Sequence, residues 1–254
     1  MCTLTWWIES SERYEVFFNR DEKKDRPVAA PPSEGHVDGV AYLAPTDPGA
    51  GGTWIVANEY GVVFALLNGY DIEPGEEPAG GWRSRGLLVR DLASITSGEE
   101  CRERIGQVDG RAYPPFRLAG FFPSQESVEV FGWLGDCSRA VSRIPPEMPM
   151  CSSSFATAEV LDARKRAFHR VVEPLEGAAA GEGEDRCGAH WRFHHDASGG
   201  ADAYTVRMNR PDAQTWSVSR ITITREQIAF LYEAESPGLT GAPGVSRSVL
   251  PRTA

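Results

Sequence analysis

The 254-residue sequence has few cysteines, no long apolar run and no excess of positive charge. Its five cysteines are odd in number and include no CxxC pair, which argues against a disulfide framework or a structural zinc site. No segment reaches the roughly 20 apolar residues of a membrane span. The first residues also lack the basic and apolar regions of a signal peptide. These absences predict a cytoplasmic protein without a membrane span.

The net charge is −10, so the chain lacks the basic surface that a general nucleic-acid-binding protein needs. Hydrophobic residues make up 41% of the chain, including eleven Phe and seven Trp, which is enough to build a core. We expect one domain over residues 1–235. Residues 236–254 contain Pro, Gly and Ser but no acidic residue, and we expect them to form a disordered tail.

Short apolar segments joined by polar turns predict hairpins, and segments with a period near 3.6 residues predict helices. A Pro-rich loop is expected at 21–35, an acidic loop at 71–81 and a mobile insertion at 176–188. The expected strands are 3–10 with 13–21, two within 51–70, two within 114–135, and 203–210 with 215–224; the expected helices are 82–94, 98–108 and 158–175.

Neither face of the expected strands is clearly polar enough to lie against solvent. In the first of them, Leu4, Trp6 and Ile8 share one side, and Thr3 and Thr5 share the other. Antiparallel hairpins that are apolar on both sides, together with a few helices, predict an α+β fold in which helices cover layered antiparallel sheets.

The second residue carries the most distinctive chemistry. If Met1 is removed, Cys2 presents a thiol and a free α-amine with a pKa of ~7.7–8, which can accept the thiol proton. A two-residue hairpin loop would place Asp21 opposite Cys2, whereas a loop one residue different would place Arg20 there. The alternative is that Cys2 is a small buried apolar residue behind a retained methionine.

Four segments read MCTLTWW, FFNRDEKKDRP, GGTWIVANEYGVVFALLNGY and RSRGLLVRDL. They resemble the NRDE-motif family, also called the transport and Golgi organisation 2 family, strongly over about the first 95 residues and more weakly to about residue 233. The resemblance implies the fold of N-terminal-nucleophile (Ntn) hydrolases, an αββα sandwich of two antiparallel sheets covered by helices.

Bile-salt hydrolases and penicillin V acylases share that fold and also begin MCT. The resemblance implies that Cys2 is the nucleophile, that Asp21 is the partner of its amine and that Arg20 belongs to the same site. Asn68 is implied as an oxyanion donor, since an amide donates to developing negative charge without titrating. The alternative for Asn68 is a turn residue in an Asn-Gly pair.

Three further residues are candidates for substrate binding. Ser153 stands where the acylases carry a second Asn, Arg207 is the candidate for their later active-site Arg, and Asn19 belongs to the NRDE motif itself.

Two other polar clusters each allow two interpretations. His190, His194 and His195, with the neighbouring Asp196, do not have the spacing of a closed metal site, so we expect a loop cluster and no metal. The segment 84–86 (Ser-Arg-Gly) opens an expected helix and could hold an anion, although a plain N-cap is the simpler interpretation.

The sequence therefore supports two functions. The first is an amidohydrolase that attacks a small amide or thioester through an acyl-enzyme on Cys2. The second is a carrier of a hydrophobic ligand such as haem or acyl-CoA, because eukaryotic members of the resembling family are linked to haem mobilisation and acyl-lipid metabolism. The partners expected are small molecules, and no cofactor is expected.

Overall fold

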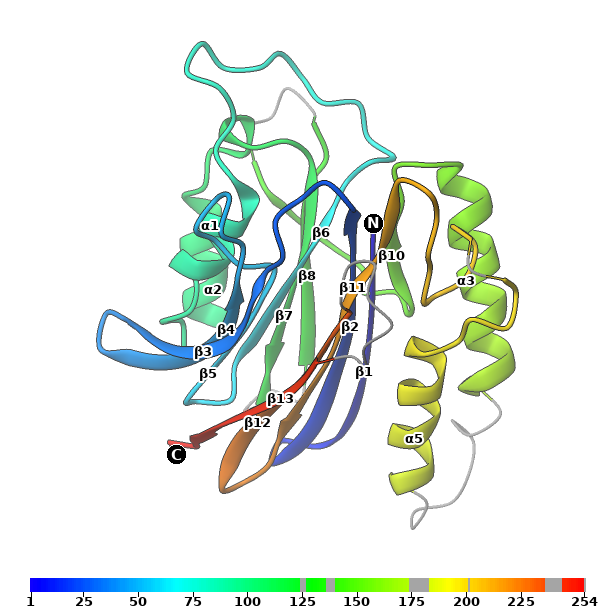
Figure 1. Ribbon diagram of the computed structural model, residues 1–254. Coiled ribbons are helices and arrows are strands. Elements are labelled where there is room, and N and C mark those ends of the chain that lie inside the picture. The colour runs from blue at the N-terminus through cyan, green and yellow to red at the C-terminus, as the bar shows by residue number, and fades with distance from the viewer. Residues whose placement is uncertain (124–126, 136–139, 174–182, 201, 236–243, 254) are drawn as a thin grey trace.

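The computed structural model describes residues 1–123, 127–135, 140–173, 183–200, 202–235 and 244–253. Within these ranges two antiparallel sheets lie face to face, and a pair of helices covers each outer side (Figure 1). The four layers confirm the predicted αββα sandwich. None of the helices described is both long and apolar enough to cross a membrane.

The six-stranded sheet has the order β10-β1-β2-β11-β12-β13. Its centre is formed by β1, β2 and β11, whose residues are buried on both faces over most of their length. Its strands are β1 (Cys2–Ser10), β2 (Arg13–Lys23), β10 (Met150–Ser152), β11 (Ala213–Ile223), β12 (Gln227–Ala234) and β13 (Gly244–Pro251).

The seven-stranded sheet has the order β3-β4-β5-β6-β7-β8-β9, so each strand pairs with its neighbour in sequence. The sequence predicts two hairpins of this meander, β5 with β6 and β7 with β8, but not the strands β3, β4 and β9. The strands of this sheet are β3 (Ala30–Val37), β4 (Val40–Thr46), β5 (Ile55–Asn58), β6 (Val63–Asn68), β7 (Phe116–Phe122), β8 (Ser127–Trp133) and β9 (Ser142–Ile144).

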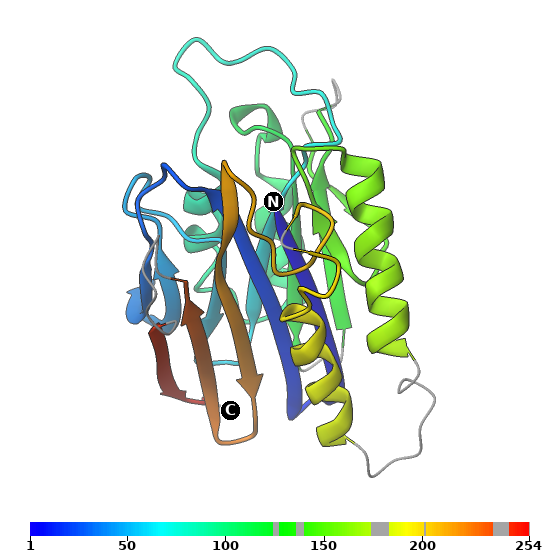
Figure 2. The ribbon, with the colours of Figure 1, turned by 45° about the vertical axis from the view of Figure 1, so that its right-hand side comes forward.

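Two short helices, α1 (Arg85–Asp91) and α2 (Gly98–Gly106), cover the seven-stranded sheet. On the other side α3 (Thr157–Val171) and α5 (Gly183–His194) lie along the six-stranded sheet (Figure 2). The α3 helix buries a stripe that includes Val160, Ala167 and Phe168, as its period predicts.

The main core lies between the two sheets. Leu4 and Trp6 of β1 point into it, while Thr3 and Thr5 point toward α3 and α5, as the alternation along the strand predicts. Because β1 is covered on both faces, its first residue lies at the end of the sheet between the two layers and not in solvent.

The first hairpin contains a β-bulge that sets its register. Ser10 pairs with Arg13 across a two-residue turn, but Ile8 pairs with Tyr14, so Glu9 is an extra residue. Cys2 therefore lies opposite Arg20, which was the alternative register, and not opposite Asp21. The side-chain pattern alone could not reveal the bulge, because both faces of this hairpin are buried.

Three regions differ from the expected elements. The segment expected to be a Pro-rich loop contains β3, an edge strand, where proline is tolerated. Residues 203–210 are not a strand, and β11 forms its hairpin with β12. Residues 183–188, expected in a mobile insertion, start helix α5; the rest of that insertion lies outside the described residues.

The expected disordered tail is also corrected. Residues 236–243 lie outside the described ranges, but residues 244–251 form β13 and pair with β12 along its whole length. Leu250 is only 5% exposed and joins the main core. The alternation in this segment is short and weak, and the free edge of β12 supplies the pairing that makes it a strand.

Replacing Leu250 with Ala should lower the free energy of unfolding by about 2 kcal/mol or more, because it removes a buried side chain from the core. The matched control is the neighbouring Val249, which is 42% exposed; Val249→Ala should cost no more than about 0.5 kcal/mol. Urea denaturation of both variants measures the difference. Equal, negligible effects would mean that this strand does not contribute to the fold.

Candidate active site

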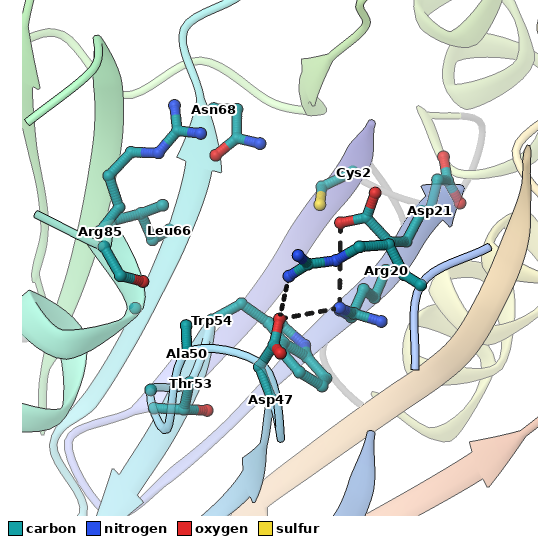
Figure 3. Close-up of a pocket in the computed structure, with 15 residues that line it drawn as sticks. Cys2, Arg20, Asp21, Asp47, Ala50, Thr53, Trp54, Leu66, Asn68 and Arg85 are labelled. Atoms are coloured by element: carbon teal, nitrogen blue, oxygen red, sulfur yellow. Dashed lines mark hydrogen bonds and ion pairs between the residues drawn. The ribbon is translucent and has the colours of Figure 1, made fainter. Parts of the chain in front are cut away.

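A cavity of about 150 Å³ opens where the starts of β1 and α1 meet the ends of β2 and β6. It brings together residues from segments far apart in sequence (Figure 3). Its walls are formed by Cys2, Arg20, Asp21, Glu22, Arg26, Asp47, Ala50, Gly52, Thr53, Trp54, Leu66, Asn68, Ser84, Arg85 and Gly86.

Cys2 points into the space between the sheets and is 8% exposed. Burial raises the pKa of its thiol, while the chain's terminal ammonium and the Arg20 guanidinium partly oppose that effect. In the chain that retains Met1, the thiol is therefore protonated at neutral pH. A thiol in this state is a poor nucleophile.

Met1 is part of the packed structure. Its α-ammonium donates to the carbonyl oxygen of Asp21 at 3.0 Å, and its own carbonyl accepts from the Asp21 N–H at 2.9 Å. Its side chain packs with Met208 and Ala213, and the Ser153 hydroxyl lies 2.9 Å from its sulfur. Removal of Met1 would therefore free two backbone groups of Asp21 and vacate a buried space next to Cys2.

The Asp21 side chain lies on the opposite face of β2 from the Cys2 sulfur (Figure 3). One carboxylate oxygen accepts from Arg164 of α3 at 3.0 Å and the other accepts from the Thr215 hydroxyl at 2.7 Å. Arg164 also donates to the Thr3 hydroxyl at 2.6 Å. The side chains of Arg164 and Asp21 are both 0% exposed, so this is a fully buried ion pair.

Arg164 is the residue that sequence reasoning missed. It lies four positions after Val160 and four before Phe168, within the apolar stripe of α3. An arginine on the buried face of an amphipathic helix predicts a buried carboxylate partner. That signal was present in the sequence, although it could not say which carboxylate the arginine meets.

Behind the same strands, a chain of hydrogen bonds connects β1 and β2 to α5. Asn19 donates its amide hydrogens to the carbonyls of His194 and Val206, so its oxygen accepts from Nδ1 of His194 at 2.7 Å. Nε2 of His194 then accepts from the Thr5 hydroxyl at 2.8 Å, and Thr5 accepts from Nδ1 of His190 at 2.9 Å. Because Nε2 of His194 accepts a hydrogen bond, this imidazole is neutral, and burial lowers the pKa of both histidines.

This arrangement corrects the interpretation of the histidine cluster as a loop. His190 and His194 lie one turn apart on α5 and pack onto the sheet, with Phe17 stacked against both rings. His195 instead pairs with Glu233 at 2.8 Å, nearer the surface. Among the described residues, no group of three or more His, Cys, Asp or Glu side chains is arranged to hold a metal ion.

Arg20 forms the floor of the cavity beside Cys2. Its guanidinium lies 4.4 Å from the centre of the Trp54 ring and 3.3 Å from a carboxylate oxygen of Asp47. Arg26 donates to the same carboxylate at 2.8 Å. Burial opposes ionisation of Asp47, but the hydrogen bond from Gly49 N–H and the charges of Arg26 and Arg20 outweigh it and lower the pKa of this carboxyl.

Asn68, at the end of β6, forms part of the facing wall. Its amide nitrogen donates to the Tyr70 hydroxyl at 2.8 Å, which uses one of its two hydrogens. The Arg85 guanidinium lies next to it (Figure 3) and donates to the Pro115 carbonyl at 2.8 Å. Asn68 is therefore a strand-end residue that lines the cavity, as well as part of an Asn-Gly pair.

Two glycines allow this wall to close. A Cβ on Gly52 would lie 2.4 Å from the carbonyl carbon of Gly86, and Thr53 N–H donates to the Gly86 carbonyl at 3.0 Å. The backbone at the start of α1 thus lies against the loop before β5, which directs Arg85 into the cavity. Ser84 is the N-cap residue of α1, as the simpler interpretation predicts, although its side chain accepts no capping hydrogen bond.

The structure thus brings Cys2, Arg20 and Asn68 to one cavity, and Asp21 also lines it, although the Asp21 carboxylate binds Arg164 on the opposite face of β2. It does not bring the other three candidates there. Asn19 faces the opposite side of β2 and binds α5, because side chains alternate along a strand. Arg207 pairs with Glu235, and Ser153 bonds the Phe155 carbonyl and contacts Met1.

A sequence model of the family described as Transport and Golgi organisation 2 matches residues 1–179. The chain belongs to this family. A search of curated protein sequences finds no significant match.

Solved structures of Ntn hydrolases share the fold. A C2A mutant of conjugated bile acid hydrolase from Clostridium perfringens is 14% identical, with a TM-score of 0.53, and the match covers 100% of this chain and 97% of that one. An N-acylethanolamine-hydrolyzing acid amidase orthologue from Caenorhabditis elegans is 10% identical, with a TM-score of 0.56 and coverage of 87% and 92%. At these identities the likeness establishes the Ntn-hydrolase fold alone.

The Arg164→Met variant should lose about 3–5 kcal/mol of the free energy of unfolding, because it leaves the Asp21 carboxylate buried without its partner cation. Arg166 provides the control, since it lies on the same helix but is exposed and pairs with Asp162. Arg166→Met should change the free energy by no more than about 1 kcal/mol. Similar losses in the two variants, measured by urea denaturation, would contradict a special role for the buried pair.

Acidification should destabilise the protein before its carboxylates titrate. Burial lowers the pKa of His190 to about 4 and also lowers that of His194, whereas an unfolded histidine titrates near ~6.5. From about pH 6.5 down to pH 4, the unfolded chain therefore binds protons that the folded chain does not, and the free energy of unfolding falls. Denaturation at several pH values should show a smaller loss for His190→Gln. Replacing the exposed His36 with Gln should leave the wild-type pH dependence unchanged.

Proposed function

We propose that this protein is a cysteine hydrolase that attacks a small amide or thioester through an acyl-enzyme on Cys2, after removal of Met1. The observation that supports this most directly is the position of Cys2. It begins the chain's first strand, faces a cavity, and has Arg20 beside it and Asn68 on the facing wall. The family membership and the Ntn-hydrolase fold agree with such chemistry.

Removal of Met1 supplies the base. The new α-amine of Cys2 takes the thiol proton, and the thiolate sulfur adds to the substrate carbonyl carbon. The resulting oxyanion accepts a hydrogen bond from the second amide hydrogen of Asn68, the one that does not bind Tyr70. The α-ammonium then returns the proton to the leaving nitrogen or sulfur as its bond to carbon breaks. Water hydrolyses the acyl-enzyme by the same route and regenerates the thiol.

The residues around the nucleophile have distinct parts in this scheme. Arg20 stabilises the thiolate by charge, and its own position is held by Asp47 and Trp54. Asp21 orients the amine through the backbone groups that Met1 now occupies and through its buried, fixed carboxylate. A thiol used in this way needs a reducing compartment, so we place the protein in the cytoplasm.

A carrier of a hydrophobic ligand is the second candidate, and a separate groove favours it. This groove, of about 350 Å³, lies between β8, β9 and α3. Apolar residues including Leu134, Ile144 and Leu161 form most of its lining, and four charged residues complete it: Asp71, Arg117, Glu147 and Lys165. Its size and the apolar part of its lining suit an acyl chain. The cavity at Cys2 is smaller than the ~300–1,000 Å³ usual for larger ligands, which disfavours haem there.

The decisive comparison is between two forms of the protein. Protein from which Met1 has been removed should react with iodoacetamide at Cys2 faster than protein in which a short extension keeps Met1 in the chain. The internal reference is the set of buried thiols whose pKa burial raises to about 11 or 12: Cys101, Cys151 and Cys187. Peptide-resolved mass spectrometry gives each rate, and Cys137 lies outside the described residues.

Incubation with acyl amides and acyl thioesters should then add one acyl mass to the Met1-free form. Asn68→Ala should cut turnover by about 10²–10³ while leaving the labelling rate of Cys2 nearly unchanged. Full retention of Met1 in cells would end the hydrolase proposal. Binding of acyl-CoA that survives Cys2→Ala, with no acyl-enzyme mass in any form, would support the carrier instead.

A further inference from the structure

Arg85 is a cation of the cavity wall without a carboxylate partner. Three guanidinium groups line the cavity, those of Arg20, Arg26 and Arg85. Arg20 and Arg26 both contact Asp47. For Arg85, no carboxylate of the described residues lies within 4.0 Å, and its hydrogen-bond partner is the Pro115 carbonyl.

The carboxylates of the cavity are already committed to other cations. Asp21 pairs with Arg164 from behind the sheet, Asp47 pairs with Arg20 and Arg26, and Glu22 lies 3.9 Å from Arg20. The walls therefore hold one positive charge that nothing in the cavity neutralises. The buried indole nitrogen of Trp54 also has no hydrogen-bond partner among the described residues, so donors exceed acceptors here.

The unpaired charge is partly removed from water. Burial lowers the pKa of the Arg85 guanidinium, and the nearby Tyr70, Cys2 and Glu22 only partly offset this. Keeping an unpaired cation in such a place is unfavourable unless something with negative charge comes to it. A guanidinium also offers several hydrogens in one plane, which matches a carboxylate or phosphate group.

We propose that Arg85 binds an anionic group of the substrate, so that the cavity at Cys2 selects amides or thioesters that carry a carboxylate or phosphate close to the scissile carbonyl. This substrate class rests on the hydrolase function proposed above. Arg85 lies beside Asn68 on the wall across from Cys2 (Figure 3), so the anion would sit near the carbonyl oxygen and would orient the carbonyl toward the sulfur.

The test compares two alkylating reagents of nearly equal size, anionic iodoacetate and neutral iodoacetamide, on Met1-free protein. In each reaction the Cys2 thiolate displaces iodide. The ratio of the two rates cancels any change in the amount of thiolate. In Arg85→Gln the ratio of iodoacetate to iodoacetamide labelling at Cys2 should fall about tenfold or more, since a hydrogen bond to a charged group is lost. Arg85→Lys should keep part of the preference.

The control is Arg83→Gln, which removes the same charge two residues away from an exposed side chain outside the cavity. It should leave the ratio unchanged, and thermal denaturation should show that all variants remain folded. An unchanged ratio in Arg85→Gln would overturn the proposal. If Cys2 reacts as slowly as Cys101 with both reagents, the activated nucleophile is refuted, while the ratio still reports on Arg85.

Ligand binding to a protein that lacks the Cys2 thiol tests the anion site independently of any catalytic activity. In the Cys2→Ala protein, N-acetylglycine should raise the thermal midpoint more than neutral N-acetylglycinamide does, and Arg85→Gln should abolish that difference. A parallel titration with inorganic phosphate distinguishes a phosphate-bearing substrate from a carboxylate-bearing one. Equal effects of N-acetylglycine and N-acetylglycinamide, with no effect of phosphate, would overturn the proposal.

Discussion

The buried ion pair between Arg164 and Asp21 is the interaction on which the geometry of the site depends. It joins α3 to β2, and the same guanidinium reaches Thr3 of β1 while the same carboxylate accepts from Thr215 of β11. Two charges without solvent exposure are tolerated only with partners of this kind. One contact therefore fixes the relative positions of the three central strands at the end where Cys2 lies.

The two faces of these strands have different tasks. The face toward α3 and α5 carries a polar network in which Asn19, Thr5 and two neutral histidines satisfy one another. The face toward the second sheet carries Cys2 and Arg20 and forms the cavity. Because side chains alternate in direction along a strand, consecutive residues of the NRDE motif point to opposite faces of β2. Asn19 binds α5, whereas Arg20 lines the cavity.

The second sheet contributes the rest of the site through close backbone contact. Gly52 and Gly86 let the start of α1 approach the loop before β5, and this approach directs Arg85 toward the cavity. With Met1 in place, Cys2 is buried and its thiol pKa is raised, so the chain as translated is an inactive form in the mechanism proposed here. Cleavage of the peptide bond between Met1 and Cys2 would give Cys2 a free α-amine and would open the buried space next to its thiol.

The sequence by itself determined the layered α+β class, the doubly buried first strand and the candidates Cys2, Arg20 and Asn68, because these follow from local alternation and from a strong family resemblance. It left the hairpin register open, and it missed β13, the burial of His190 and His194, and the partner of Asp21. The tertiary structure decided these features. A bulge at Glu9 shifts the pairing by one residue, and a strand at a sheet edge depends on its neighbour. A charge inside an apolar stripe finds its partner only when α3, more than 130 residues later in sequence, packs onto the sheet.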